Sequence, residues 1–121
     1  MPLTGENRTI VKHGLALLEN CERPGLVALL EGCGLADKPV TSENISFALA
    51  PRLNAAGRRE TAATALQLLL CEDFEKAQAL TARLNQANAD RQAAEQTILS
   101  EAEAQIAADP ARLRDRVLLV W

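Results

Sequence analysis

The stretch FEKAQALTARLNQANADRQAAEQTILSEAEAQIAA, residues 74–108, decides the fold predicted for this chain. It contains neither glycine nor proline, so no residue in it interrupts helical hydrogen bonding. At about 1.5 Å per residue the helix would be roughly 50 Å long, which is longer than a globule of 121 residues needs. The stretch therefore predicts a spacer helix between larger bodies, ended by Pro110.

The apolar seam of this predicted helix alternates by three and four residues and is interrupted at its centre. Its positions are Ala77, Leu80, Leu84, Ala87, Arg91, Ala94 and Ile98. Arg91 occupies an apolar position, with Gln92 next to it, and Asn85 and Asn88 precede it. Two interpretations stay open. Either the aliphatic stem of Arg91 packs while its charge reaches water, or this part of the helix faces a polar ligand or groove.

Shorter helices are predicted before the long one. They cover residues 6–19, residues 24–32, a segment capped by Thr41 or Ser42, and a segment from about Glu60 through TAATALQLLL. The first carries one broad apolar stripe, made of Ile10, Val11, Leu15, Leu17 and Leu18. The last is apolar nearly all round and is predicted to be buried. Pro51 is predicted to end or kink the third helix, and Asp73 to cap the long one.

The end of the chain and the aromatic content complete the prediction of the fold class. VLLVW, residues 117–121, is a short apolar β-like run with no second strand to pair with. The aromatic residues are Phe47, Phe74 and Trp121 alone, and a core of Leu, Ala, Val and Ile favours helices packed on helices. The predicted fold class is all-α: short helices plus one long connecting helix, with a short terminal β-like strand at 117–121.

Composition and charge indicate which kinds of protein this chain can be. With 48% apolar and 24% charged residues the chain is typical of a folded domain, and its net charge of −3 gives no global signal for nucleic acid. The three cysteines are widely spaced, so reduced thiols are expected, and the one histidine, His13, is expected to be a surface residue. The sequence shows no metal-ligand cluster or cofactor motif, its first residues lack the apolar region of a signal peptide, and no apolar run has membrane length. We therefore expect no metal or cofactor site in this chain, no membrane partner and a cytoplasmic location.

The segment PRLNAAGR, residues 51–58, is the part of the sequence that carries chemistry. Gly57 permits either a turn with positive φ or the close approach of a ligand. Arg52, Asn54 and Arg58 can then direct several donors to one place, where guanidinium groups bind phosphate in a bidentate way. The segment predicts a phosphate-binding site.

A structural alternative fits the same residues. Arg59 follows the segment directly, and an exposed loop could pair these arginines with Glu43 or Glu60. Such ion pairs are common on protein surfaces and contribute little to stability. Spacing alone leaves both interpretations open.

A family resemblance favours the phosphate-binding site over the loop with ion-paired arginines. Residues 46–73, SFALAPRLNAAGRRETAATALQLLLCED, closely resemble the segment that ends the catalytic DHH core of the RecJ family of single-strand-specific DNA exonucleases. Residues 1–15, MPLTGENRTIVKHGL, extend the resemblance upstream, and residues 84–99, LNQANADRQAAEQTIL, resemble the long connecting helix of that family. RLNAAGR, followed by a helix that ends in LLLCED, is the most specific part.

The resemblance implies a 5′-to-3′ exonuclease that acts in bacterial DNA recombination and repair. Its partner would be single-stranded DNA, and its cofactor would be Mn²⁺ or Mg²⁺, both expected of the full-length protein. The match in RLNAAGR implies that Asn54 and Arg58 contact DNA phosphates near the metal site. Arg52 in the same string and Gln92 on the connecting helix are further candidates for the DNA path.

The resemblance also implies a division of the chain. Residues 1–71 would be the C-terminal helical part of a DHH-type catalytic core, residues 72–109 the interdomain connecting helix, and residues 110–121 the start of a DHHA1-type domain. The aspartate-rich metal motifs and the DHH triplet of the family are not in this sequence. No catalytic residue or metal ligand is therefore assigned, and the chain by itself is expected to be inactive.

A second interpretation belongs to a different class of protein. The three-and-four seam also suits a small helical interaction or dimerisation module without a nucleic-acid role. Self-association would then use the exposed helix seam or the terminal strand. RLNAAGR discriminates between the two, because a dimerisation module has no need of that glycine and those arginines.

Overall fold

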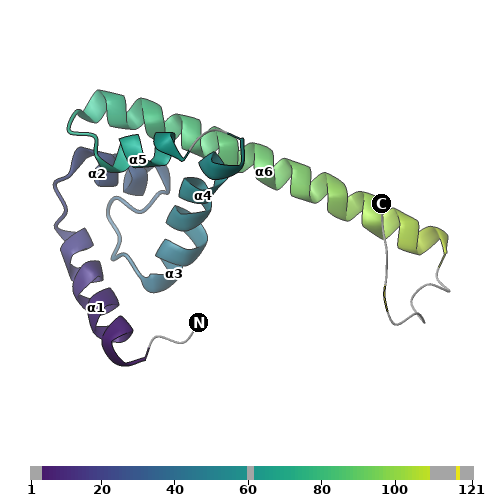
Figure 1. Cartoon of the computed structure of the whole chain (residues 1–121), viewed down its shortest axis with the longest axis horizontal. Coiled ribbons are helices and arrows are strands. Elements are labelled where there is room, and N and C mark those ends of the chain that lie inside the picture. Colours follow the sequence, from purple (N-terminus) through teal and green to yellow (C-terminus); the bar gives the residue numbers. More distant parts are fainter. Residues whose placement is uncertain (1–3, 60–61, 110–116, 118–121) are drawn as a thin grey trace. The chain divides into compact units, whose positions relative to one another are not determined.

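The computed structural model describes residues 4–59, 62–109 and 117, with no side-chain detail for residues 56–59. Its elements are α1 (Gly5–Glu19), α2 (Pro24–Gly32), α3 (Ser42–Asn44), the π-helical turn η1 (Ile45–Leu49), α4 (Ala50–Arg59), α5 (Ala63–Leu69) and α6 (Phe74–Ala108). No strand occurs in these described ranges. The all-α prediction with one long helix is confirmed (Figure 1).

The chain divides into two compact units, and the division falls inside α6. The first unit is Met1–Asn88 and the second is Ala89–Trp121. The predicted strand at 117–121 lies outside the described residues except for Val117, which is in a bend and exposed. Within the part of the chain that the structure describes, no helix combines the length and apolarity needed to span a bilayer.

The core lies in the first unit, where residues of α2, η1 and α5 pack with the beginning of α6. Figure 1 shows α2 and α5 beside the first turns of α6. Its buried residues are Ala28, Leu29, Leu30, Leu35, Val40, Leu49, Leu68, Ala77, Leu80 and Leu84. The side chains of Leu29, Leu68 and Leu84 are the largest that are fully buried. The core is thus made of aliphatic side chains on packed helices, as the low aromatic content predicts.

Two glycines of α2 mark where this helix touches its neighbours. A Cβ on Gly25 would lie 1.8 Å from the carbonyl oxygen of Leu68 in α5. A Cβ on Gly32 would lie 2.4 Å from Cγ2 of Thr81 in α6. Helix α2 is therefore fixed between α5 and α6 by contacts that leave no room for a side chain.

The long helix begins and ends where the sequence predicts. Asp73 is the N-cap, because its Oδ1 accepts a 2.8 Å hydrogen bond from the backbone N–H of Lys76. The buried part of the predicted seam stops near the middle of the helix: Ala77, Leu80 and Leu84 are buried, whereas Ile98 is 64% exposed.

Three local predictions need correction. Helix α1 is confirmed, but its broad stripe is not one packed face: Leu15 and Leu18 pack against the core, whereas Ile10 and Leu17 are exposed. At 100° per residue these two sit about 80° or more from the packed pair, so a flat contact covers only half of the stripe. Helix α5 is buried on one face only, because Leu66 is 57% exposed.

The third correction concerns Pro51, which does not end its helix. Helical backbone continues from Ser42 to Arg59, and the change in regularity comes earlier, in η1. The N–H of Ala50 bonds to the carbonyl of Ile45 in this π-helical turn, and Pro51 follows as the second residue of α4. A missing N–H is tolerated in the first turn of a new helical segment. Gly57 accordingly lies inside a helix and not at a turn.

Candidate nucleic-acid interface

Helix α4 carries the predicted phosphate-binding residues, and its course is set by a capping box upstream. Thr41 Oγ1 accepts from the N–H of Asn44 at 3.2 Å, and Asn44 Oδ1 accepts from the N–H of Thr41 at 2.9 Å. This reciprocal pair starts the helical run that leads through η1 into α4. The RLNAAGR segment is thus presented on a helix with a defined start.

Asn54 and its neighbours in α4 alternate between solvent and core. The side chain of Asn54 is exposed, whereas Ala55 is 4% exposed and Leu53 packs against the core cluster. Position 58 comes one helical turn after position 54, so the two positions share a face of α4. The structure thus brings Asn54 to the surface.

Arg52 is bound within the protein. Its Nε donates a 2.6 Å hydrogen bond to Oδ1 of Asn85, and one terminal nitrogen donates a 2.7 Å bond to the carbonyl of Ala48. Both bonds are part-buried. At least two of the five N–H groups of this guanidinium therefore serve internal contacts.

Asn85 extends this network to the end of α2. Its Nδ2 donates a 3.2 Å bond to the carbonyl oxygen of Gly32. We call Arg52, Asn85 and the carbonyls of Gly32 and Ala48 the Arg52–Asn85 clamp. It joins α2, η1 and α4 to α6 through polar contacts beside the apolar core.

The charge of Arg52 in the clamp affects the thiol of Cys33. Burial raises the pKa of its thiol above the usual value, and the positive charge of Arg52 partly offsets this rise. Cys33 is the C-cap residue of α2, directly after Gly32. A displacement of the Arg52 guanidinium is therefore expected to change the pKa of this thiol.

Gln92 lies on α6 in the second unit and is exposed. One residue earlier, Arg91 donates to Oε1 of Glu95 at 2.5 Å, an (i, i+4) ion pair along the helix. The Arg91 side chain is 27% exposed. Its guanidinium pairs with Glu95 at the surface, whereas most of the side chain is shielded from water. Arg52 and Asn54 belong to the first unit.

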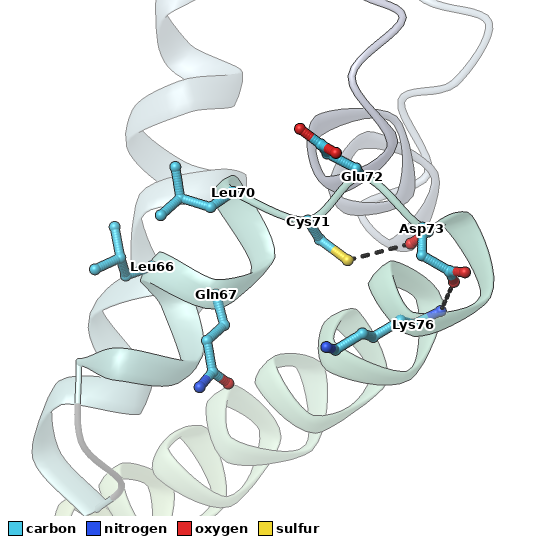
Figure 2. Close-up of a pocket in the computed structure, with 7 residues that line it drawn as sticks. All are labelled: Leu66, Gln67, Leu70, Cys71, Glu72, Asp73 and Lys76. Carbon is cyan, nitrogen blue, oxygen red and sulfur yellow. Dashed lines mark hydrogen bonds between the residues drawn. The ribbon is translucent and has the colours of Figure 1, made fainter.

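A pocket of about 490 Å³ lies elsewhere in the first unit, where α5 ends and α6 begins (Figure 2). It is lined by Leu66, Gln67, Leu70, Cys71, Glu72, Asp73 and Lys76. The Sγ of Cys71 donates to the backbone carbonyl of Asp73 at 3.2 Å, which shapes the joint between the helices. Two carboxylates against one ammonium make this pocket a poor receptor for phosphate.

Sequence reasoning placed Asn54 on the surface segment but missed the role of Asn85. The only signal for Asn85 was its polar side chain near an apolar seam, which did not specify its partner. Among the described residues, no group of three or more His, Cys, Asp or Glu side chains could hold a metal ion. These described residues therefore do not offer the ligands that the Mn²⁺ or Mg²⁺ implied by the resemblance would need.

Comparisons with curated proteins relate the sequence of this chain to one class of protein, the single-stranded-DNA-specific exonucleases. RecJ of Thermus thermophilus is 44% identical over 98 residues, which cover 81% of this chain and 14% of that protein. RecJ of Bacillus subtilis is 42% identical over 92 residues, 76% of this chain and 12% of that protein. RecJ of Salmonella typhimurium is 36% identical over 104 residues, 84% of this chain and 18% of that protein.

The chain is homologous to a segment of the RecJ exonucleases, and the resemblance expected from the sequence is confirmed. It spans less than one fifth of the length of these curated relatives. No family model matches the chain.

Proposed function

We propose that this chain forms part of the single-stranded-DNA path of a RecJ-like 5′-to-3′ exonuclease that acts in recombination and repair. The proposal rests chiefly on homology to proteins named as single-stranded-DNA-specific exonucleases. The segment RLNAAGR, in α4, is the part with phosphate-binding chemistry. The exonuclease activity belongs to the whole protein, and the chain alone is expected to be inactive.

Within this proposal the chain has three parts. Residues 1–71 form the C-terminal helical part of a DHH-type core, residues 72–109 the connecting helix, and residues 110–121 the start of a DHHA1-type domain. The Mn²⁺ or Mg²⁺ of such an enzyme would be held outside the described residues of this chain, because these offer no fitting cluster of ligands.

The chemistry proposed for α4 is binding of DNA phosphates. The exposed amide of Asn54 can donate to a phosphate oxygen, and Arg58, one helical turn later, can donate in a bidentate way. Gln92 is proposed as a further contact along the DNA from the connecting helix.

The test is fluorescence anisotropy of a labelled single strand against the chain, across a series of salt concentrations. For single strands the slope of log K against log[salt] is about −0.7 per neutralised phosphate. We expect Arg58→Ala to weaken binding about tenfold and to reduce the slope by about 0.7, because one charged contact is lost. Asn54→Ala should weaken binding and leave the slope unchanged, because an amide displaces no counterion.

Arg8→Ala is the matched control, since Arg8 is an exposed arginine of α1, outside the RLNAAGR segment. It should change affinity by less than about twofold. Equal effects of Arg8→Ala and Arg58→Ala would mean that binding is non-specific, and would contradict the proposal. Sedimentation velocity without DNA tests the alternative, a helical module that self-associates through the exposed seam near Ile98 and Leu99.

A further inference from the structure

The guanidinium of Arg52 occupies a part-buried position between α4 and α6, in contrast to the exposed Asn54 two residues later. Its hydrogen bonds to Asn85 and Ala48 measure 2.6 and 2.7 Å. Charge-assisted bonds of this length are the stronger class of hydrogen bond. If Arg52 turned outward to hold a phosphate, Asn85 Oδ1 and the carbonyl of Ala48 would each lose one charge-assisted hydrogen bond in a part-buried site, which is costly.

The orientation of the Asn85 amide is determined by its two partners. A guanidinium only donates hydrogen bonds and a backbone carbonyl only accepts them. Oδ1 of Asn85 must therefore face Arg52, and Nδ2 must face the carbonyl of Gly32. No other assignment of the amide satisfies both neighbours.

The contact at Gly32 leaves the amide little freedom. A Cβ at Gly32 would lie 3.1 Å from Nδ2 of Asn85 and 2.4 Å from Cγ2 of Thr81. The end of α2 thus presses on the same turn of α6 that carries Asn85. A change at Asn85 is therefore expected to disturb the placement of α4 through Arg52.

We propose that Arg52 and Asn85 are positioning residues: they hold α4 against α6 so that Asn54 and Arg58 meet the DNA, and Arg52 is not itself a phosphate ligand. The inference rests on the proposed function for its DNA readout. It assigns the three polar residues of RLNAAGR to two roles, with Asn54 and Arg58 toward the strand and Arg52 toward the protein.

The salt dependence of DNA binding separates a positioning residue from a phosphate ligand. We expect Arg52→Ala and Asn85→Ala each to weaken binding severalfold with the slope unchanged, whereas Arg58→Ala also reduces the slope by about 0.7. The double variant should bind no more weakly than the worse single variant, because both substitutions break one clamp. A slope reduced by about 0.7 in Arg52→Ala, with Asn85→Ala binding normally, would overturn the proposal.

A second readout does not involve DNA and uses the Cys33 thiol. The background carries Cys21→Ala and Cys71→Ser, so that Cys33 is the only cysteine, and the pH dependence of its reaction with a thiol reagent is measured. Arg52→Ala and Asn85→Ala should both raise the thiol pKa. The first removes the positive charge that lowers this pKa, and the second releases that charge from the acceptor that holds it. Asn54→Ala, on the exposed face of α4, is the matched control and should leave the pKa unchanged.

DNA binding and the thiol titration distinguish a failure of the proposed function from a failure of the Arg52–Asn85 clamp. If no variant and not even the unsubstituted chain binds DNA, the proposed function fails, and the thiol titration alone decides whether the clamp holds Arg52. A thiol pKa that rises in Arg52→Ala but not in Asn85→Ala would show that Asn85 does not position the guanidinium, and would overturn the inference. If Asn85→Ala unfolds, Asn85→Gln serves as the second variant, because its longer stem displaces the amide while retaining its polarity.

Discussion

Gly25 is the residue at which α2 and α5 come into backbone contact. A Cβ there would lie 1.8 Å from the carbonyl oxygen of Leu68, an atom of the backbone that cannot turn aside. We expect Gly25→Ala to lower the free energy of unfolding by about 1–3 kcal/mol, the usual range for overpacking a core. Urea denaturation followed by circular dichroism measures the effect.

Gly14 provides the matched control for this prediction. It lies inside α1, and a Cβ at this position would meet nothing within 4 Å. Gly14→Ala is expected to stabilise the chain by about 0.5–1 kcal/mol, because alanine loses less backbone entropy in a helix. Equal effects of the two substitutions would refute the close α2–α5 contact.

The positions of the polar residues in the RLNAAGR segment were partly predictable from the sequence. Arginines and an asparagine in one short segment indicated a polar surface, and Asn54 is exposed as this required. The inward position of Arg52 was not predictable, because its partner Asn85 is 33 residues away in sequence. A side chain with five donors fits water, a phosphate or an internal acceptor equally well until the fold supplies one of them.

At the scale of the element, the start of α6 depends on one carboxylate. Asp73 Oδ1 accepts from the N–H of Lys76, and its charge also interacts favourably with the positive end of a long helix. We expect Asp73→Ala to lower the free energy of unfolding by about 0.5–2 kcal/mol. Asp73→Asn should retain most of this contribution, since its side-chain oxygen can still cap the helix.

Asp37, an exposed aspartate outside the helices, is the control for the capping prediction. Asp37→Ala is expected to change the free energy of unfolding by less than about 0.5 kcal/mol. Thermal and urea denaturation of the three variants in the same buffer makes the comparison. A loss in Asp37→Ala as large as that in Asp73→Ala would indicate a general charge effect and would count against the cap.

Helix bounds were predictable where the local chemistry is strong, as at Pro24, Asp73 and Pro110. The exception was Pro51, which local rules treat as a helix breaker. The structure absorbs it by the π-helical turn of η1, which changes the hydrogen-bond pattern just before the proline. Leu49, the last residue of this turn, is buried in the core, and local sequence rules do not include such packing.

At the scale of the whole molecule, the packed core lies entirely within the first unit, and the last buried residue of α6 is Asn88. A chain of residues 1–92, the first unit plus one further turn of α6, should therefore fold cooperatively. Its free energy of unfolding is expected to fall by less than about 1 kcal/mol, so its Tm should fall by no more than roughly 4–8 °C. Differential scanning calorimetry of the shortened and full chains measures this.

Leu84→Ala in the full chain is the comparison for the shortened chain. Leu84 is 1% exposed, and its truncation should cost about 2–5 kcal/mol because a cavity is left in the core. The shortened chain should thus be more stable than this single-residue variant of the full chain. A shortened chain without a cooperative transition would contradict the division into two units.

The sequence by itself determined the helical class, most helix bounds, the length of α6 and the relation to RecJ, because these follow from short-range chemistry and from residue identity along the chain. Only the tertiary structure decided which half of each apolar stripe is buried, and that Arg52 is directed to Asn85. The periodicity of apolar residues predicts that a helix has an apolar face. The width of the face that becomes buried depends on the helix that packs against it. A polar side chain likewise takes its partner from whatever the fold brings within about 3 Å.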